Sequence, residues 1–250
     1  MFIDTHAHLN FDPFFKDVEP FLERAISNRV EKIIVPSVDV PSSEKSIILS
    51  EKYKEIFTAV GIHPHDSEKA DNNFLKILEE YSKNKKVVAI GEIGLDYYRN
   101  YSEKKIQKRK FQEQLELAKS LNLPIIIHNR NADYDVLEIM ERVDYFNGQM
   151  HCFSSDLEFA KRILEKGMLI SFTGVVTFSK KASEVASNLP LERLMIETDS
   201  PFMAPVPFRG KTCEPSFVIE IAKKYSEIFN IKLEEVEKIT TQNAEKLFNI

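Results

Sequence analysis

Residues 2–8 read Phe-Ile-Asp-Thr-His-Ala-His, and the rest of the chain is arranged around this stretch. Two apolar residues lead into an aspartate and then into a His-x-His pair. In a β-strand, side chains two positions apart point to the same face, so His6 and His8 are expected to converge. Two converging neutral imidazoles suit a divalent metal ion. The pair alone does not distinguish a metal site from a surface strand that carries two histidines.

Short apolar or β-branched runs alternate with longer amphipathic stretches along the rest of the chain. Eight runs predict strands, in residues 1–6, 32–36, 57–63, 87–93, 124–128, 148–153, 168–172 and 194–198. Helical periodicity follows each run, in residues 14–28, 43–53, 74–83, 102–121, 132–143, 157–166, 180–187, 216–229 and 233–248. Strands separated by helices pair in parallel, and eight such units close into a (β/α)8 TIM barrel. An open doubly wound sheet is the weaker alternative, because no G-x-G-x-x-G turn follows the first strand.

Length and composition indicate one globular domain over residues 1–250. The chain has the size of a single β/α barrel, with 43% hydrophobic and 29% charged residues. The formal net charge of −5 gives no general attraction to nucleic acid or to an anionic membrane. We find no signal peptide, no long apolar run and no C-x-x-C spacing between Cys152 and Cys213. We therefore expect a reduced, cytoplasmic protein that is monomeric and not bound to a membrane.

All six histidines fall at the C-terminal end of a predicted strand or just beyond it. They are His6, His8, His63, His65, His128 and His151. In a β/α barrel these strand ends form the mouth in which active sites lie. Two carboxylates join them, Glu92 near the end of the fourth strand and Asp199 after the eighth. A carboxylate on an apolar strand is costly to bury unless it is paired or bound to metal, so the mouth is a predicted metal site.

Three further residues lie close to the predicted mouth. Asp4 and Glu197 each lie two residues before a predicted ligand, His6 and Asp199. They either orient the ligands or are hydrogen-bonded polar residues. Cys152 alternates with His151, so it is expected to point away from the barrel interior and to serve in packing.

Seven short motifs resemble those of the TatD family of metal-dependent deoxyribonucleases, within the amidohydrolase-like barrels. They are DTHAH (residues 4–8), GIHPH (61–65), GEIGLDYY (91–98), LPIIIH (123–128), HCFS (151–154), ETDSP (197–201) and RGK (209–211). They follow the order of the family across almost the whole chain. The resemblance implies two divalent cations at the mouth. His6, His8 and Asp199 would hold one ion, His128 and His151 would hold the other, and Glu92 would bridge the two.

The chemistry of this ligand set leaves the identity of the two ions open. Imidazole and carboxylate ligands together accept Zn²⁺ or Mn²⁺, and less readily Mg²⁺. Two ions about 3.5–4 Å apart can lower the pKa of a bridging water and clamp both the attacking and the leaving oxygen. Glu92 and Asp199 are therefore the predicted catalytic residues. Asp199 either accepts the proton of the water or is a ligand only.

The resemblance also implies a substrate, which is DNA. Five residues are predicted to bind it: His63, His65, Arg130, Arg209 and Lys211. The three cations follow barrel strands, where loops often bind phosphate, although each has a surface ion pair as its alternative. The two histidines are not needed as ligands. The expected reaction is hydrolysis of phosphodiester bonds at a 3′ end or on single strands, and the alternative is hydrolysis of a small amide, a lactone or a D-aminoacyl ester by the same site.

Overall fold

The computed structural model describes residues 1–99 and 101–250, and its strands form one parallel eight-stranded sheet. The strands are β1 (Phe2–Asp4), β2 (Val30–Pro36), β3 (Ile56–Val60), β4 (Val87–Asp96), β5 (Ile125–Arg130), β6 (Gly148–Met150), β7 (Leu169–Phe172) and β8 (Leu194–Ile196). Each strand pairs with the next one along the chain, from β1 to β8. This order is the one that a (β/α)8 barrel requires.

The ring closes through residues that lie just beyond the ends of β1 and β8. Ala7 and Ser200 form a parallel bridge, and the Thr5 N–H donates a hydrogen bond to the Ile196 carbonyl. The predicted barrel is therefore confirmed. The first strand is shorter than residues 1–6, because the chain beyond Asp4 turns to meet the segment after β8.

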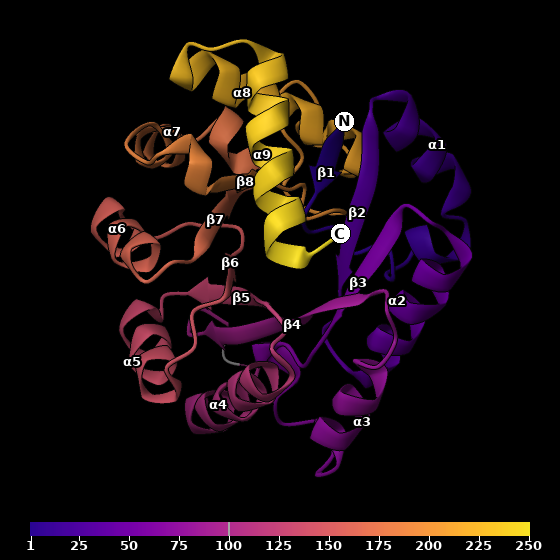
Figure 1. Cartoon of the computed structure of the whole chain (residues 1–250), viewed down its shortest axis with the longest axis vertical. Helices are drawn as coiled ribbons and strands as arrows, with labels where there is room; N and C mark the ends of the chain where they lie inside the picture. The colour runs from indigo at the N-terminus through magenta and orange to yellow at the C-terminus, as the bar shows by residue number, and fades with distance from the viewer. Residues whose placement is uncertain (100) are drawn as a thin grey trace.

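Helices enclose the ring of strands, as Figure 1 shows. They are α1 (Glu19–Ser27), α2 (Val40–Lys52), α3 (Phe74–Tyr81), α4 (Lys104–Leu121), α5 (Asp133–Val143), α6 (Leu157–Glu165), α7 (Lys180–Ser187), α8 (Val218–Phe229) and α9 (Leu233–Phe248). Short 3-10 helices occupy Phe14–Lys16, Pro64–Asp66, Gly174–Thr177, Leu191–Arg193 and Pro215–Phe217. Across the described parts of the chain, no helix is both long enough and apolar enough to cross a membrane.

Local chemistry explains where several helices begin. The predicted helix over residues 14–28 is divided, because Asp17 has a non-helical backbone conformation and α1 begins again with Pro20 in its first turn. At the start of α2 the Asp39 carboxylate accepts the Ser42 N–H, and the Ser42 hydroxyl accepts the Asp39 N–H. This reciprocal pair is a capping box, which satisfies two backbone donors that the helix itself leaves free.

The hydrophobic core has two parts. The larger part lies between the strands and the surrounding helices. The smaller part lies inside the ring and contains Ile3, Ile34, Ala59, Ile126 and Met195, with Ala244 and Phe248 of α9. Hydrogen bonds from Thr241 to the Met1 carbonyl and from Asn243 to the Leu194 carbonyl hold α9 in place. Helix α9 therefore covers the N-terminal end of the barrel (Figure 1).

Gly94 permits a close approach of β4 and β5 beside the mouth. Its φ of +139° lies in a region that residues with a Cβ atom rarely adopt. A Cβ atom at this position would lie 1.9 Å from the carbonyl oxygen of His128. The glycine thus allows two strands that carry Glu92 and His128 to run against each other at the rim.

Candidate metal centre

The C-terminal ends of the strands surround a cavity of about 530 Å³. Predicted site residues on its wall are His8, His63, His65, Glu92, His128, Arg130, His151 and Asp199. The volume is in the range of sites for small ligands. His6 lies directly beneath the wall and is completely buried.

One oxygen of Glu92 faces a first group of candidate ligands, His6, His8 and Asp199. The Nε2 atoms of His6 and His8 are 3.2 Å apart, and Glu92 Oε2 lies 3.4 Å and 3.6 Å from them. Asp199 Oδ1 lies 3.8 Å from His6 Nε2 and 3.5 Å from His8 Nε2. Ligands at about 2.0–2.1 Å in a tetrahedral zinc site are about 3.3–3.4 Å from one another. These four donor atoms therefore have the spacing that a single ion requires.

The other oxygen of Glu92 faces a second group. Glu92 Oε1 lies 2.9 Å from His128 Nδ1, 2.8 Å from His151 Nε2 and 3.4 Å from His63 Nε2. Burial favours protonation of Glu92, but the positive charge of His151 and the hydrogen bonds with His128 and His151 hold its pKa well below the usual range. A carboxylate that is ionised and faces both groups has the position that a bridge between two ions needs. The bridging role remains a prediction.

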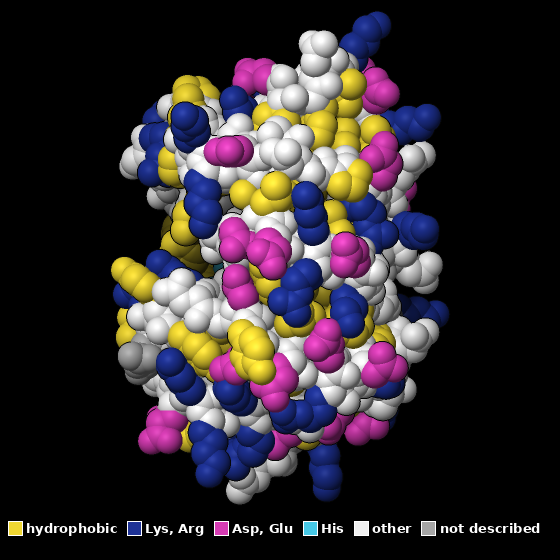
Figure 2. All heavy atoms as spheres, turned by 90° about the vertical axis from the view of Figure 1, so that its left-hand side faces the viewer, with side chains coloured by type: hydrophobic (Ala, Val, Ile, Leu, Met, Phe, Trp, Pro, Cys, Tyr) yellow, Lys and Arg dark blue, Asp and Glu magenta, His cyan; other side chains and the backbone are white. Residues whose placement is uncertain are grey.

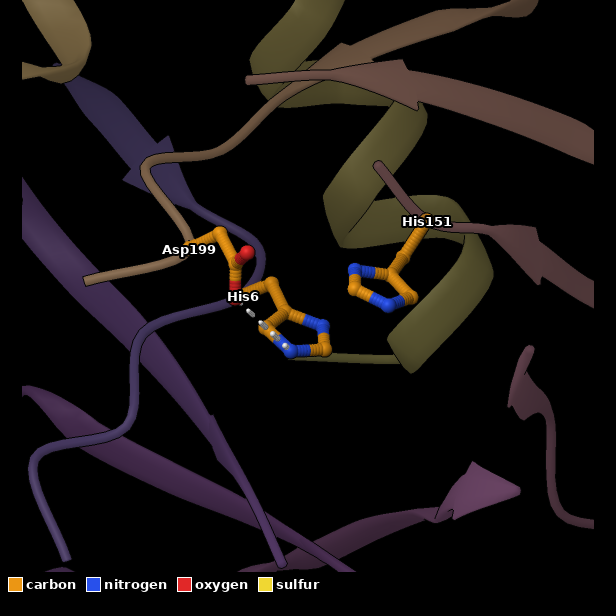
Figure 3. Close-up of side chains that lie close together, drawn as sticks. All are labelled: His6, His151 and Asp199. Atoms are coloured by element: carbon orange, nitrogen blue, oxygen red, sulfur yellow. Dashed lines mark ion pairs between the residues drawn. The ribbon is translucent and has the colours of Figure 1, made fainter. Parts of the chain in front are cut away.

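Three side chains from distant parts of the sequence converge at the centre of the mouth (Figure 3). The rings of His6 and His151 stack with centroids 3.9 Å apart, and Asp199 points toward His6. One donor atom from each of the three lies within 4.8 Å of the others. Asp199 has a φ of +55°, a left-handed conformation that aspartate tolerates better than most residues. Its N–H donates to the His6 carbonyl at 2.8 Å, which fixes the backbone beside the ligands.

A ring nitrogen without a hydrogen-bond partner indicates that this donor set fits a metal ion. His151 Nε2 is buried and makes no hydrogen bond to any described residue, although Glu92 Oε1 lies 2.8 Å from it. Buried polar atoms normally have a partner, and a missing ion is one physical reason for an exception. Imidazole nitrogens with carboxylate oxygens suit Zn²⁺ or Mn²⁺. The residues present are therefore able to hold divalent metal ions.

Asp96 has a role that the sequence pattern did not predict. Its side chain is buried, and Oδ2 lies 3.1 Å from His128 Nε2 and 2.9 Å from His65 Nε2. Because the carboxylate is an acceptor, a neutral His128 that binds a metal ion would keep its proton on Nε2 and offer Nδ1, which faces Glu92, as the ligand atom. The signal was present in β4, where strand alternation places Glu92, Gly94 and Asp96 on one face.

Replacing Asp96 with asparagine is expected to weaken metal binding by about 10- to 100-fold, as for other partners of metal-bound histidines. The asparagine oxygen can keep the hydrogen bonds that Asp96 Oδ1 accepts from the N–H groups of Tyr98 and Arg99. Its NH₂ group then faces His128 Nε2 and favours the tautomer in which Nδ1 is protonated. Competition with a chelating dye measures the affinity. Asp135→Asn is the matched control, since that carboxylate pairs with Tyr97 and Lys108.

The structure separates the roles of Asp4 and Glu197. Asp4 accepts hydrogen bonds from the hydroxyl and N–H of Thr198 and from the His6 N–H, and burial raises its pKa to about 8. It thereby fixes the backbone that joins β1 to β8 and hydrogen-bonds to none of the histidine rings described. Glu197 instead accepts hydrogen bonds from the Gln149 side chain and the Cys152 N–H, and its Oε1 lies 3.6 Å from His151 Nδ1, which is too long for a hydrogen bond. Asp4 thus positions the chain between β1 and β8, and Glu197 fixes the backbone directly after the candidate ligand His151.

The carboxylates at the mouth change the protonation of two histidines. Burial disfavours a charged His128, but hydrogen bonds with Asp96 and Glu92 raise its pKa above the ordinary value. Burial also disfavours a charged His151, but the charge of Glu92 and the contact with Glu197 raise its pKa well above the ordinary value. Both rings therefore keep a proton at higher pH than a free histidine does.

Metal-stripped protein is expected to release protons when it binds metal. A ring nitrogen has to lose its proton before it can act as a ligand. Because the pKa values of His128 and His151 are raised, the metal affinity is expected to increase with pH until both rings are neutral. Calorimetric titration with Zn²⁺ in two buffers of different ionisation enthalpy counts the protons released. Identical heats in both buffers would contradict this expectation.

His63 differs from the other rings because of one backbone contact. Its Nδ1 accepts the N–H of His65 at 3.1 Å, and burial lowers its pKa to about 4. A neutral imidazole whose Nδ1 is an acceptor carries its proton on Nε2. His63 therefore presents an N–H donor. It also lies close enough to Glu92 and His128 to be a possible metal ligand, since one donor atom of each lies within 4.8 Å of the others.

The predicted substrate-binding residues fall into two sets. Of the five, His63, His65 and Arg130 line the cavity in the part of the chain that the structure describes, and Arg209 and Lys211 do not. The Arg209 guanidinium lies 3.8 Å from the ring centroid of Phe178 and donates to the Ala204 carbonyl. Lys211 is exposed beside Phe208. A substrate would have to extend beyond the cavity to reach these two cations.

Cys152 corrects an expectation from strand alternation. Its φ of +43° turns the chain after His151, so alternation no longer applies, and the side chain lines the cavity instead of pointing away. Burial raises the pKa of its thiol well above the ordinary value, so the group is a thiol and not a thiolate. We assign it no chemical role.

The chain is similar in sequence and in fold to a family of known proteins. The TatD-related DNase family matches residues 3–249. The chain is 44% identical over 254 residues to YabD of Bacillus subtilis, named an uncharacterized metal-dependent hydrolase, with 100% of both chains covered. The solved structure of YjjV, a TatD homologue from Escherichia coli K12, has a TM-score of 0.94 and 33% identity, and the match covers 100% of this chain and 98% of that one. A TatD family hydrolase from Entamoeba histolytica has a TM-score of 0.92 and 30% identity, with 99% and 97% covered.

Proposed function

Because this chain belongs to the TatD-related DNase family of metal-dependent hydrolases, we propose that it hydrolyses phosphodiester bonds of DNA. The expected substrate is a single strand or a frayed end, attacked from its 3′ end. The observation that carries the proposal is the arrangement around Glu92, whose two oxygens face two groups of candidate ligands on the wall of a small cavity. Such an arrangement suits the two-ion hydrolysis of phosphate esters.

The distances are compatible with the ligand sets that the family resemblance implies. His6, His8 and Asp199 would hold one ion, and His128 and His151 would hold the other, with Glu92 shared between them. Divalent ions at these positions would supply a water of lowered pKa and neutralise the charge that develops on the phosphate oxygens. The donor set leaves Mg²⁺, Mn²⁺ and Zn²⁺ as candidates.

Asp199 is the residue that we assign to proton transfer. Burial raises the pKa of its carboxyl, but the hydrogen bond with His8 and the charge of His6 have the larger, opposite effect. The net result is a lowered pKa, so the group is ionised at neutral pH. It lines the cavity and accepts the proton of the water that attacks phosphorus. One P–O ester bond breaks in the same reaction. The leaving oxygen takes up a proton from solvent, and the products are a hydroxyl end and a phosphate monoester.

His63 and Arg130 are placed to hold the phosphate. His63 lines the cavity as a neutral donor, and its Nε2 lies 3.4 Å from Glu92 Oε1. Arg130 is exposed on the cavity wall, and no described carboxylate lies within ion-pair distance of its guanidinium. Its donors are therefore free to form paired hydrogen bonds with phosphate oxygens.

The net charge and the face shown in Figure 2 offer no extended basic groove for DNA. On the face over α5, α6 and α7, basic and acidic side chains are interspersed, as Figure 2 shows. A net charge of −5 likewise provides no long-range attraction for DNA. A cavity of about 530 Å³ accepts the end of a strand more readily than a duplex.

The proposal is tested with a single-stranded DNA oligonucleotide and with the same sequence as a blunt duplex. Metal-stripped protein is titrated with Mg²⁺, Mn²⁺ and Zn²⁺, and the length of the labelled strand is followed. We expect stepwise shortening that requires metal and is faster on the single strand. If protein with metal bound cleaves neither DNA under any ion, the nuclease proposal fails, and the same site has to be tested on amides, lactones and aminoacyl esters.

A further inference from the structure

One wall of the cavity is apolar and open to solvent. Phe202 and Met203 lie just after the candidate ligand Asp199, line the cavity and are 50% and 40% exposed. The Phe202 N–H donates to the Asp199 carbonyl at 2.8 Å, so the position of the ring is tied to that of the ligand. The ring also meets His8 edge-on, with centroids 6.4 Å apart. A large apolar side chain this exposed at the mouth of a site indicates that it contacts a ligand.

The opposite wall is cationic. Arg99 follows β4 and Arg130 ends β5, and both line the cavity. The Arg130 guanidinium lies 3.9 Å from the ring centroid of Tyr98, which holds it flat. In a ring of eight strands in chain order, β4 lies opposite β8. The candidate metal centre therefore lies between a cationic wall and the aromatic wall that contains Phe202.

We infer that Phe202 is the platform for an unpaired nucleobase next to the bond that is cleaved, and that Arg99 and Arg130 hold the phosphates of the adjoining strand. This inference rests on the proposed function and adds to it the mode of substrate recognition. Every base has a flat aromatic face, so stacking on phenylalanine tolerates any sequence. Phosphates bind to paired guanidinium donors, which the opposite wall supplies.

Stacking on Phe202 explains how the site would select single strands. A base that lies flat on the ring cannot at the same time remain stacked and paired in a duplex. The terminal base pair of a duplex would have to open first, which costs energy that a single strand does not spend. Selection would then depend on a side chain that touches neither metal nor phosphate.

The test uses stacking itself as the signal. Oligonucleotides carry 2-aminopurine at the terminal position, and its fluorescence is quenched when the base stacks on an aromatic ring. In EDTA, where no turnover occurs, we expect quenching by the wild-type protein and by Phe202→Tyr, but not by Phe202→Ala. Tyr134→Ala is the control, because Tyr134 is an aromatic side chain that is 77% exposed and is not among the described residues of the cavity wall.

Kinetics provide the second readout. Base–aromatic stacking predicts that Phe202→Ala lowers kcat/KM roughly 5- to 150-fold on normal single strands. On a strand whose terminal nucleotide is abasic, the same substitution is expected to have little effect, because no base is present to stack. Cleavage by Phe202→Ala at the wild-type rate, without a change in quenching, would overturn the inference and leave the nuclease proposal intact. Quenching that depends on Phe202 in a protein that cleaves no DNA would support the base site and refute the nuclease.

Discussion

Replacing Glu92 with glutamine is expected to abolish nearly all hydrolysis and to remove metal from the protein. Glu92 is buried, and its two oxygens lie within 3.6 Å of nitrogens on five histidines. Removing one partner from a buried, charged group costs about 3–5 kcal/mol, which corresponds to a loss of metal affinity on the order of 10²- to 10⁴-fold. A glutamine also presents one NH₂ group where a ligand oxygen was.

Two measurements check this result, the metal content of the purified protein and its rate of hydrolysis. Glu214→Gln is the matched control, because Glu214 is also a buried carboxylate but pairs with Arg24 through its two oxygens. The control is expected to keep its metal even if it loses stability. A Glu92→Gln protein that retains two ions and most of its activity would refute the central position of this carboxylate.

Replacing Asp199 with asparagine is expected to lower kcat by about 10²- to 10⁴-fold, the range that positioned proton-transfer groups contribute. The mechanism of the loss differs from that at Glu92. His6, His8 and Glu92 still surround the first position, so metal binding is expected to weaken less than it does in Glu92→Gln. Asparagine occupies the same volume but cannot accept a proton.

The metal concentration distinguishes a base from a ligand at position 199. Rates of the wild type and of Asp199→Asn are compared across a metal titration that extends to saturation. If Asp199 only binds metal, a high concentration restores the rate of the variant. If Asp199 accepts the proton, the rate stays low at saturation, and this is the result that we expect. Asp156→Asn is a suitable control, since this carboxylate caps α6 through the Phe159 N–H.

The barrel could be predicted from the sequence because its strands are apolar runs and its helices have a clear helical periodicity of apolar residues. Residues 180–187 and 233–248 are predicted as helices and form α7 and α9 with the same bounds. Strand ends are less predictable. Residues 148–153 are predicted as one strand, but β6 stops at Met150, because Cys152 adopts a positive φ. Periodicity reports burial, and it does not report where a chain turns.

The candidate site was partly accessible for a similar reason. Parallel strands bring their C-terminal ends together, so residue types at those ends predict a common mouth without any knowledge of distances. The role of Asp96 and the N–H donor of His63 could not be predicted in this way. Both depend on which atom of an imidazole meets which neighbour, as in the contact between His63 Nδ1 and the His65 N–H. Arg209 and Lys211 show that residues after a barrel strand need not line the cavity, and their contact with substrate stays a prediction.

The helix across the N-terminal end of the barrel has a consequence for traffic through the molecule. Ala244 and Phe248 of α9 pack against apolar residues inside the ring, so this end offers no exit. Whatever this hydrolase cleaves therefore arrives and departs by the same opening. A polymer cannot be threaded through the barrel, and each released fragment has to leave before the remaining chain can advance. Release of the product and re-entry of the substrate thus compete for the single opening at the C-terminal ends of the strands.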